Sequence, residues 1–194
     1  TLLSAMVLPG VLLLTGWPLA CRAGNQQTVK IPDANLAGHI ARALNVTSGE
    51  ITLADMERLT DLEIDFFSAY WHRGVANLEG LQAARNLTSL RIWSKPPRPA
   101  LETTNLAPLM GLSNLATLVL SGNQLASLIL PQGLTGLRTL DLQENWLTNL
   151  SLPDDMGGLT NLVLRGNSLV GLVVPDGWSE LAALDLRYNQ LIDF

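Results

Sequence analysis

Residues that could do chemistry are few and scattered in this 194-residue chain. His39 and His72 are its two histidines, and neither has a cysteine or a group of acidic residues at the spacing that metal sites use. The adjacent Asp154 and Asp155 could contact a cation, but their place just after a proline favours a solvated turn. The sequence contains no glycine-rich phosphate loop, no H-E-x-x-H helix and no G-x-S-x-G turn. We therefore predict no catalytic residue, no cofactor and no metal site.

Cys21 is the single cysteine, which excludes an internal disulfide framework. It follows an uncharged, largely apolar stretch typical of a secretory signal, so we expect residues 1–23 to direct export. The sequence leaves three alternatives open: cleavage after Ala20 with lipidation of Cys21, cleavage after Ala23 by a general signal peptidase, or retention of the segment as an anchor. Because the chain begins with threonine and has no basic residue ahead of the apolar stretch, we also expect that its first residues are missing.

The charge balance argues against two classes of partner. Twelve basic residues stand against 17 acidic ones, which gives a net charge of −5. A chain without a basic surplus does not neutralise phosphates, so we predict no nucleic-acid partner. It has no attraction to anionic lipid either. Contact with a membrane is therefore expected only through the signal or a lipid anchor.

Leucine supplies 42 of the 194 residues, and most of those after residue 58 follow one pattern. The motif L-x-x-L-x-L-x-x-N-x-L recurs at a spacing of 22 residues, in units starting near 115, 137, 159 and 181. Two looser units start at Leu59 and Leu87, 28 residues apart. A register kept over this length predicts a stack of structural repeats, because a single coil buries too little apolar surface to fold alone.

These motifs resemble the leucine-rich repeat family, in the 22-residue class of internalin-like proteins of the bacterial surface, over about residues 29–194. The resemblance implies an α/β fold: a leucine-rich repeat solenoid, a curved right-handed stack of coils with a parallel sheet on its concave face and a helical N-terminal cap. It implies a cap at 24–58 and repeats over 59–194. In this family partners usually bind the concave face.

Each repeat carries an asparagine between inward-pointing leucines. A buried amide needs partners for its donors and its acceptor, so we interpret this column as a structural ladder bonded to the backbone, in preference to a polar binding column. Its members are Asn123, Asn145, Asn167 and Asn189.

Ahead of the repeats, apolar residues at helical spacing predict two short amphipathic helices. Asp33 and Thr52 stand where helix N-caps are expected, with Asp55 three residues after Thr52. We predict a lid over the first coil, made of Leu36, Ile40, Leu44, Ile51 and Met56.

The variable residues of each predicted strand point away from the leucines and form columns on the concave face. Arginines and acidic residues there offer charge-assisted hydrogen bonds, and two aromatic residues at the border offer anchors for an interface. The alternative is an ordinary solvated sheet with offsetting charges. Ser94 falls in the same columns. The candidate partner-binding residues are Arg91, Trp93, Asp141, Gln143, Glu144, Arg165, Asp185, Arg187 and Tyr188.

We therefore predict an extracytoplasmic binding module, secreted or lipid-anchored, that recognises a protein or glycan at the cell surface and catalyses nothing itself. Two other functions stay open: the targeting domain of a larger envelope enzyme or adhesin whose other domains follow residue 194, and a structural spacer. Because the last unit stops at Phe194, halfway around its coil, we also expect end-to-end self-association of the chain.

Overall fold

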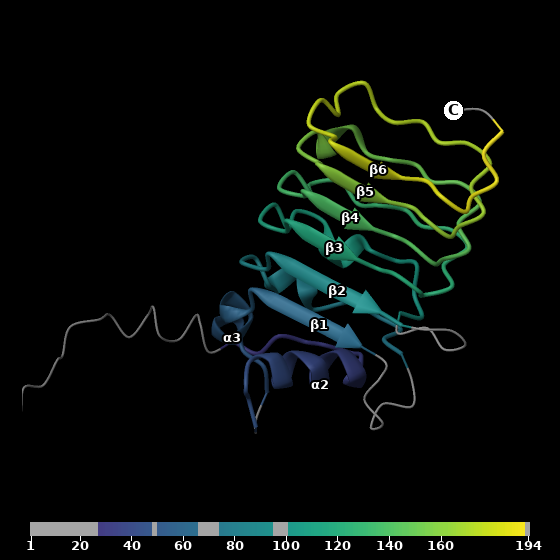
Figure 1. Ribbon diagram of the computed structural model, residues 1–194. Helices are drawn as coiled ribbons and strands as arrows, with labels where there is room; N and C mark the ends of the chain where they lie inside the picture. Colours follow the sequence, from purple (N-terminus) through teal and green to yellow (C-terminus); the bar gives the residue numbers. More distant parts are fainter. Residues whose placement is uncertain (1–26, 48–49, 66–73, 95–100, 193–194) are drawn as a thin grey trace, which may run out of the picture.

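The computed structural model describes residues 27–47, 50–65, 74–94 and 101–192. In these ranges, two short helices are followed by six parallel strands that lie in one sheet in sequence order, β1 to β6. Figure 1 shows the strands stacked one above another, with α2 against β1 at one end of the stack. Cys21, His72 and Phe194 lie outside the described residues.

The regular elements are short, as the 22-residue repeat requires. The helices are α2 (Ala34–Ala43) and α3 (Leu53–Arg58). The strands are β1 (Asp61–Asp65), β2 (Ser89–Trp93), β3 (Thr117–Val119), β4 (Thr139–Asp141), β5 (Asn161–Val163) and β6 (Ala183–Asp185). Three 3-10 helices lie between strands, η1 (Leu81–Ala83), η2 (Ala107–Leu109) and η3 (Asp154–Met156).

Both predicted helix caps are present. The Asp33 carboxylate accepts hydrogen bonds from two backbone N–H groups of the first turn of α2, at 2.9 and 3.0 Å. Thr52 and Asp55 form a capping box at the start of α3, with each side chain accepting from the backbone N–H of the other. The second oxygen of Asp33 accepts from the backbone N–H groups of Ala76 and Asn77. This residue therefore also ties the helical cap to the first coil.

The leucine motif forms one continuous core through the stack. Leu62 of β1 lies beside Leu90 of β2, and Leu90 lies beside Leu118 of β3, so the two looser units share the register of the regular ones. The same alignment continues to Leu184 at β6. The predicted lid residues are all buried against this core: Leu36, Ile40, Leu44, Ile51 and Met56.

The asparagine column joins each coil to the one before it. The side-chain oxygen of Asn145 accepts from the backbone N–H groups of Asn123 and Leu125, each at 3.0 Å. Its amide nitrogen donates to the carbonyl oxygens of Leu120 and Leu142 at 2.9 and 3.0 Å. Asn145 is 3% exposed. Corresponding bonds to the backbone are made by Asn123, Asn167 and Asn189.

Candidate functional site

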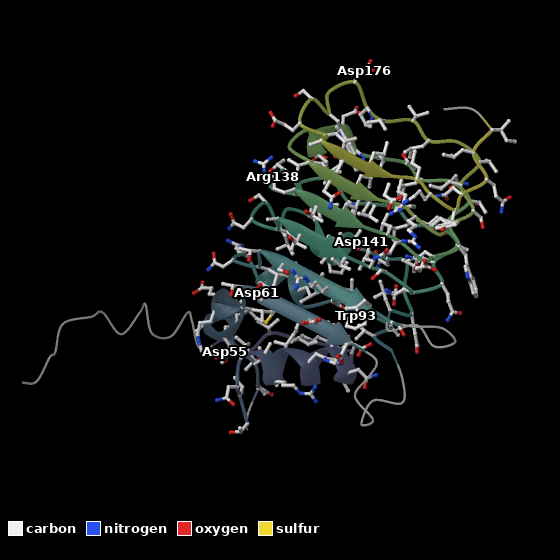
Figure 2. The ribbon with its side chains drawn as sticks, viewed as in Figure 1. Asp55, Asp61, Trp93, Arg138, Asp141 and Asp176 are labelled. Carbon is white, nitrogen blue, oxygen red and sulfur yellow. The ribbon has the colours of Figure 1, made fainter. Side chains whose placement is uncertain are left out.

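The candidate site is the face of the sheet turned away from the leucine core, which we call the concave face. In β2, Leu90 and Ile92 are fully buried beneath it, whereas Arg91 is exposed and Trp93 is half-buried. Figure 2 shows Trp93 and Asp141 at two levels of the stack. Charged and aromatic residues of this face form one group at β1 and β2 and another at β4 to β6, because β3 carries no charged side chain.

Arg187 and Asp185 form a two-point ion pair at the last strand. Arg187 Nη2 lies 2.6 Å from Asp185 Oδ2, and Nε lies 2.9 Å from Oδ1. The backbone N–H of Arg187 donates to Oδ1 as well, at 3.1 Å. Hydrogen bonds from Arg187 to the ionised carboxylate lower the pKa of Asp185 to about 2. Both oxygens of Asp185 are thus engaged within the chain.

Asp141 is engaged in the same way by Gln143. Oδ1 of Asp141 accepts from the backbone N–H of Gln143 at 2.9 Å, and Oδ2 accepts from Gln143 Nε2 at 3.1 Å. Burial raises the pKa of Asp141, and the hydrogen bonds from Gln143 oppose that rise. The sequence placed the two residues in neighbouring columns, and the structure makes them partners.

Arg165 and Tyr188 form the cationic and aromatic part of this group. The central carbon of the Arg165 guanidinium lies 4.9 Å from the centroid of the Tyr188 ring, which is a cation–π distance. Tyr188 is 72% exposed. The Nε atom of Arg165 is buried and has no hydrogen-bond partner among the described residues. The pair therefore presents an aromatic ring and a positive charge side by side.

Glu144 and Tyr188 stand directly before the ladder asparagine of their coils and have φ values of 55° and 58°. The corresponding residues of two other coils are Gly122 and Gly166, with φ values of 71° and 70°. This left-handed conformation costs a residue with a Cβ about 1 kcal/mol or more. Glu144 and Tyr188 thus keep their side chains at a cost in stability, a pattern typical of functional positions.

Acidic residues of β1 also belong to the concave face. Glu63 Oε1 accepts from Trp93 Nε1 at 2.9 Å, which joins β1 to β2. Asp61 and Asp65 flank Glu63 on the same side of the strand. The columns identified in the sequence began at Arg91 and missed these three residues. The alternation of acidic and apolar residues in β1 is the signal that could have found them.

A cavity of about 310 Å³ lies between α2 and the first two strands. Asp61, Glu63, Arg42 and Arg91 are among the residues that line it, together with His39. His39 is 6% exposed, and burial lowers its pKa, with a further contribution from the positive charge of Arg42. The imidazole is therefore neutral near pH 7. The sequence placed His39 on the cap helix without showing that it borders the concave face.

The structure corrects the position of Ser94, which the sequence placed on the concave face. Ser94 is 6% exposed because its backbone packs against Gly122 of the next coil, with no room for a Cβ at Gly122.

Asp155, which the sequence placed in a turn with Asp154, has a hydrogen-bond partner in the preceding coil. Its Oδ2 atom accepts from the backbone N–H of Gly133 at 2.6 Å and so links neighbouring coils.

In the described part of the chain, no three His, Cys, Asp or Glu side chains gather where they could hold a metal ion. No helix in those ranges is long and apolar enough to cross a bilayer.

Comparison with solved structures finds leucine-rich repeat proteins of bacteria. An internalin (inlF) from Listeria monocytogenes is 25% identical, with a TM-score of 0.66, over 84% of this chain and 45% of its own. An internalin C2 from the same organism is 23% identical, with a TM-score of 0.48, over 84% of this chain and 77% of its own. A leucine-rich repeat protein from Leptospira interrogans is 23% identical, with a TM-score of 0.46, over 71% and 39%. No protein-family model and no curated protein matches the sequence.

The parallel six-stranded sheet and the match in fold define a leucine-rich repeat solenoid, an architecture whose extended concave surface serves binding. The chain has an internalin-like leucine-rich repeat fold, and it spans 45% of the length of the inlF internalin. The fold class and the resemblance predicted from the sequence are both confirmed.

Proposed function

We propose that this chain is an extracytoplasmic binding module that recognises a protein partner through its concave face and catalyses no reaction of its own. One observation carries the proposal: Glu144 and Tyr188 keep charged and aromatic side chains at backbone positions that favour glycine. Their side chains are not needed for the core, since both residues are exposed. A role on the open surface accounts for keeping them.

The composition of the concave face supports a protein partner. Trp93, Tyr188 and three arginines lie on it, and tryptophan, tyrosine and arginine are the residue types that dominate protein interfaces. The indole of Trp93 is held by Glu63, and the ring of Tyr188 lies beside Arg165. Anchors held in place lose less conformational entropy when a partner binds.

The test replaces three concave residues together: Trp93→Ser, Arg165→Gln and Arg187→Gln. Binding to intact cells and to an array of matrix and cell-surface proteins is then measured for the purified chain. Because residues of these types each contribute about 2 kcal/mol or more at the centre of an interface, we expect affinity to fall at least about tenfold.

The matched control replaces three exposed residues outside the concave face, Trp146→Ser, Arg85→Gln and Lys30→Gln. This variant is expected to bind like the unmodified chain. Equal binding by the concave variant would refute the proposal. Binding confined to a glycan array, and lost in the concave variant, would replace the protein partner by a glycan.

We also propose that residues 1–23 direct export and that Cys21 is a lipid attachment site. Bacteria that express the full chain are expected to incorporate a labelled fatty acid into it, and Cys21→Ala is expected to remove the label. Unlabelled protein in the medium would favour cleavage by a general signal peptidase instead. Unlabelled protein retained in the cytoplasm would refute export.

A further inference from the structure

The aspartates of β4 and β6 already have hydrogen-bond partners within the chain. Both oxygens of Asp185 are bonded to Arg187, and both oxygens of Asp141 are bonded to Gln143. In each pair the hydrogen-bond donor is the residue two positions after the aspartate, just past the end of the same strand. Each carboxylate is thus already engaged by a residue of its own coil, and neither forms a hydrogen bond with Arg165.

Arg165 is that third residue. It follows β5, in the coil between those of the two pairs, and its guanidinium stacks over Tyr188 at 4.9 Å. No hydrogen bond from its side chain to the described residues is formed, and the Nε atom is buried without a partner. An arginine side chain carries five N–H donors, and a buried donor without an acceptor is costly. Arg165 thus holds a positive charge with unused donors at the open concave face.

We propose that Arg165 is the receptor for a carboxylate of the protein partner, an Asp or Glu side chain, which the guanidinium edge binds through paired hydrogen bonds. This inference rests on the proposed function and names the chemistry of its contact. Guanidinium and carboxylate match in this two-point geometry, as Arg187 and Asp185 demonstrate one coil away. Arg165 helps to lower the pKa of Asp185 through its charge, but it has no carboxylate within hydrogen-bond distance among the described residues.

The surroundings of Arg165 favour this ligand in two ways. The Tyr188 ring holds the guanidinium in place, so less side-chain freedom is lost on binding. Nε is buried, so a partner does not reach it, whereas Nη1 and Nη2 are neither buried nor bonded to other described residues. A carboxylate that accepts from these two atoms gains paired hydrogen bonds without breaking any that the described residues already form.

The local charge favours a single negative charge over a phosphate. Asp141, Glu144 and Asp185 stand against Arg165 and Arg187 in this group, three acidic residues to two basic ones. The Glu144 side chain lies against Gly166, the residue that follows Arg165. A group with two negative charges is repelled more strongly by these carboxylates than a carboxylate is.

The experiment follows the side-chain Nε–H signals of the arginines by nuclear magnetic resonance in the full chain at constant ionic strength. The probes are glutamate capped at both ends, capped glutamine and inorganic phosphate. We expect capped glutamate to shift the Arg165 signal saturably and at least about threefold more than the signals of Arg91 and Arg187. Capped glutamine should leave it unmoved. A shift shared equally by all arginines, no shift at Arg165, or a preference for phosphate would overturn the proposal.

A conservative variant supplies a second measurement. Arg165→Lys keeps the charge and loses the paired donors, so affinity for capped glutamate is expected to fall about tenfold. The matched control, Arg85→Lys at an exposed position outside the concave face, should change it by less than about twofold. Unchanged affinity in Arg165→Lys would overturn the assignment, and an unchanged backbone spectrum shows that the variant is folded.

The outcome is separable from that of the proposed function. If the chain loses its partner in the triple concave variant but the Arg165 signal does not respond to capped glutamate, the concave face binds by other chemistry and this inference alone fails. If the triple variant binds like the unmodified chain, the proposed function itself fails.

Discussion

Replacing Asn145 by alanine tests how strongly the asparagine ladder holds the coils together. The change removes the acceptor of two backbone N–H groups, those of Asn123 and Leu125, and the donor to the carbonyl of Leu120. All four residues are buried. A buried backbone group that loses its partner costs about 1–3 kcal/mol. Three backbone groups lose a partner, so we expect the free energy of unfolding to fall by about 3–5 kcal/mol, a large share of the about 5–15 kcal/mol typical of a domain.

The assay is urea unfolding followed by circular dichroism, with the slope compared between variants to check that unfolding stays cooperative. The matched control is Asn149→Ala, an exposed asparagine of the same coil, which should change stability by no more than about 0.5 kcal/mol. If Asn145→Ala costs no more than Asn149→Ala, the ladder does not stabilise the stack and the reasoning is wrong.

Three further predictions concern the concave face and its turns. Glu144→Gly is expected to raise the free energy of unfolding by about 1 kcal/mol in urea titration and Glu144→Ala is not, because only glycine relieves a φ of 55°; equal effects would contradict this. Burial raises the pKa of Asp141 in the folded chain, so its ionised form opposes folding; Asp141→Asn should therefore stabilise at pH 7, and the gain should vanish below about pH 4, where unfolded aspartate also protonates. An equal gain at pH 7 and pH 3 would argue against this origin. In thermal unfolding, Gly122→Ala should cost more than about 1 kcal/mol, because its φ is 71° and a Cβ would meet the carbonyl oxygen of Ser94, whereas Gly171→Ala, with nothing within 4 Å, should be close to neutral.

The features that the sequence predicted well depend on local periodicity. The leucine spacing fixed which residues face the core, and Leu62 and Leu90 lie in one register although their units are 28 residues apart. The caps at Asp33 and Thr52 follow from short-range hydrogen bonding to the first turn of a helix. Such features need no knowledge of distant residues, so a single sequence suffices.

The candidate site was predicted less completely, because a column says only on which face a side chain lies. Trp93 bonds to Glu63, which is 30 residues away and was left out of the columns. Ser94 follows the same alternation as its neighbours and is nevertheless buried, since the backbone turns where it packs against the next coil. His39 borders a cavity of the concave face because α2 lies against β1.

By itself the sequence determined a stack of 22-residue coils, its buried asparagines and most of the residues on the open face. Those properties repeat along the chain, and each coil imposes them on the next. Only the tertiary structure decided which polar and charged residues of that face bind each other. Asp185 is paired with Arg187, and Asp141 with Gln143, while the guanidinium of Arg165 rests on Tyr188. The physical reason is that these contacts depend on side-chain conformations, within a coil for the two aspartates and between coils for Arg165, and the spacing in sequence leaves those conformations open.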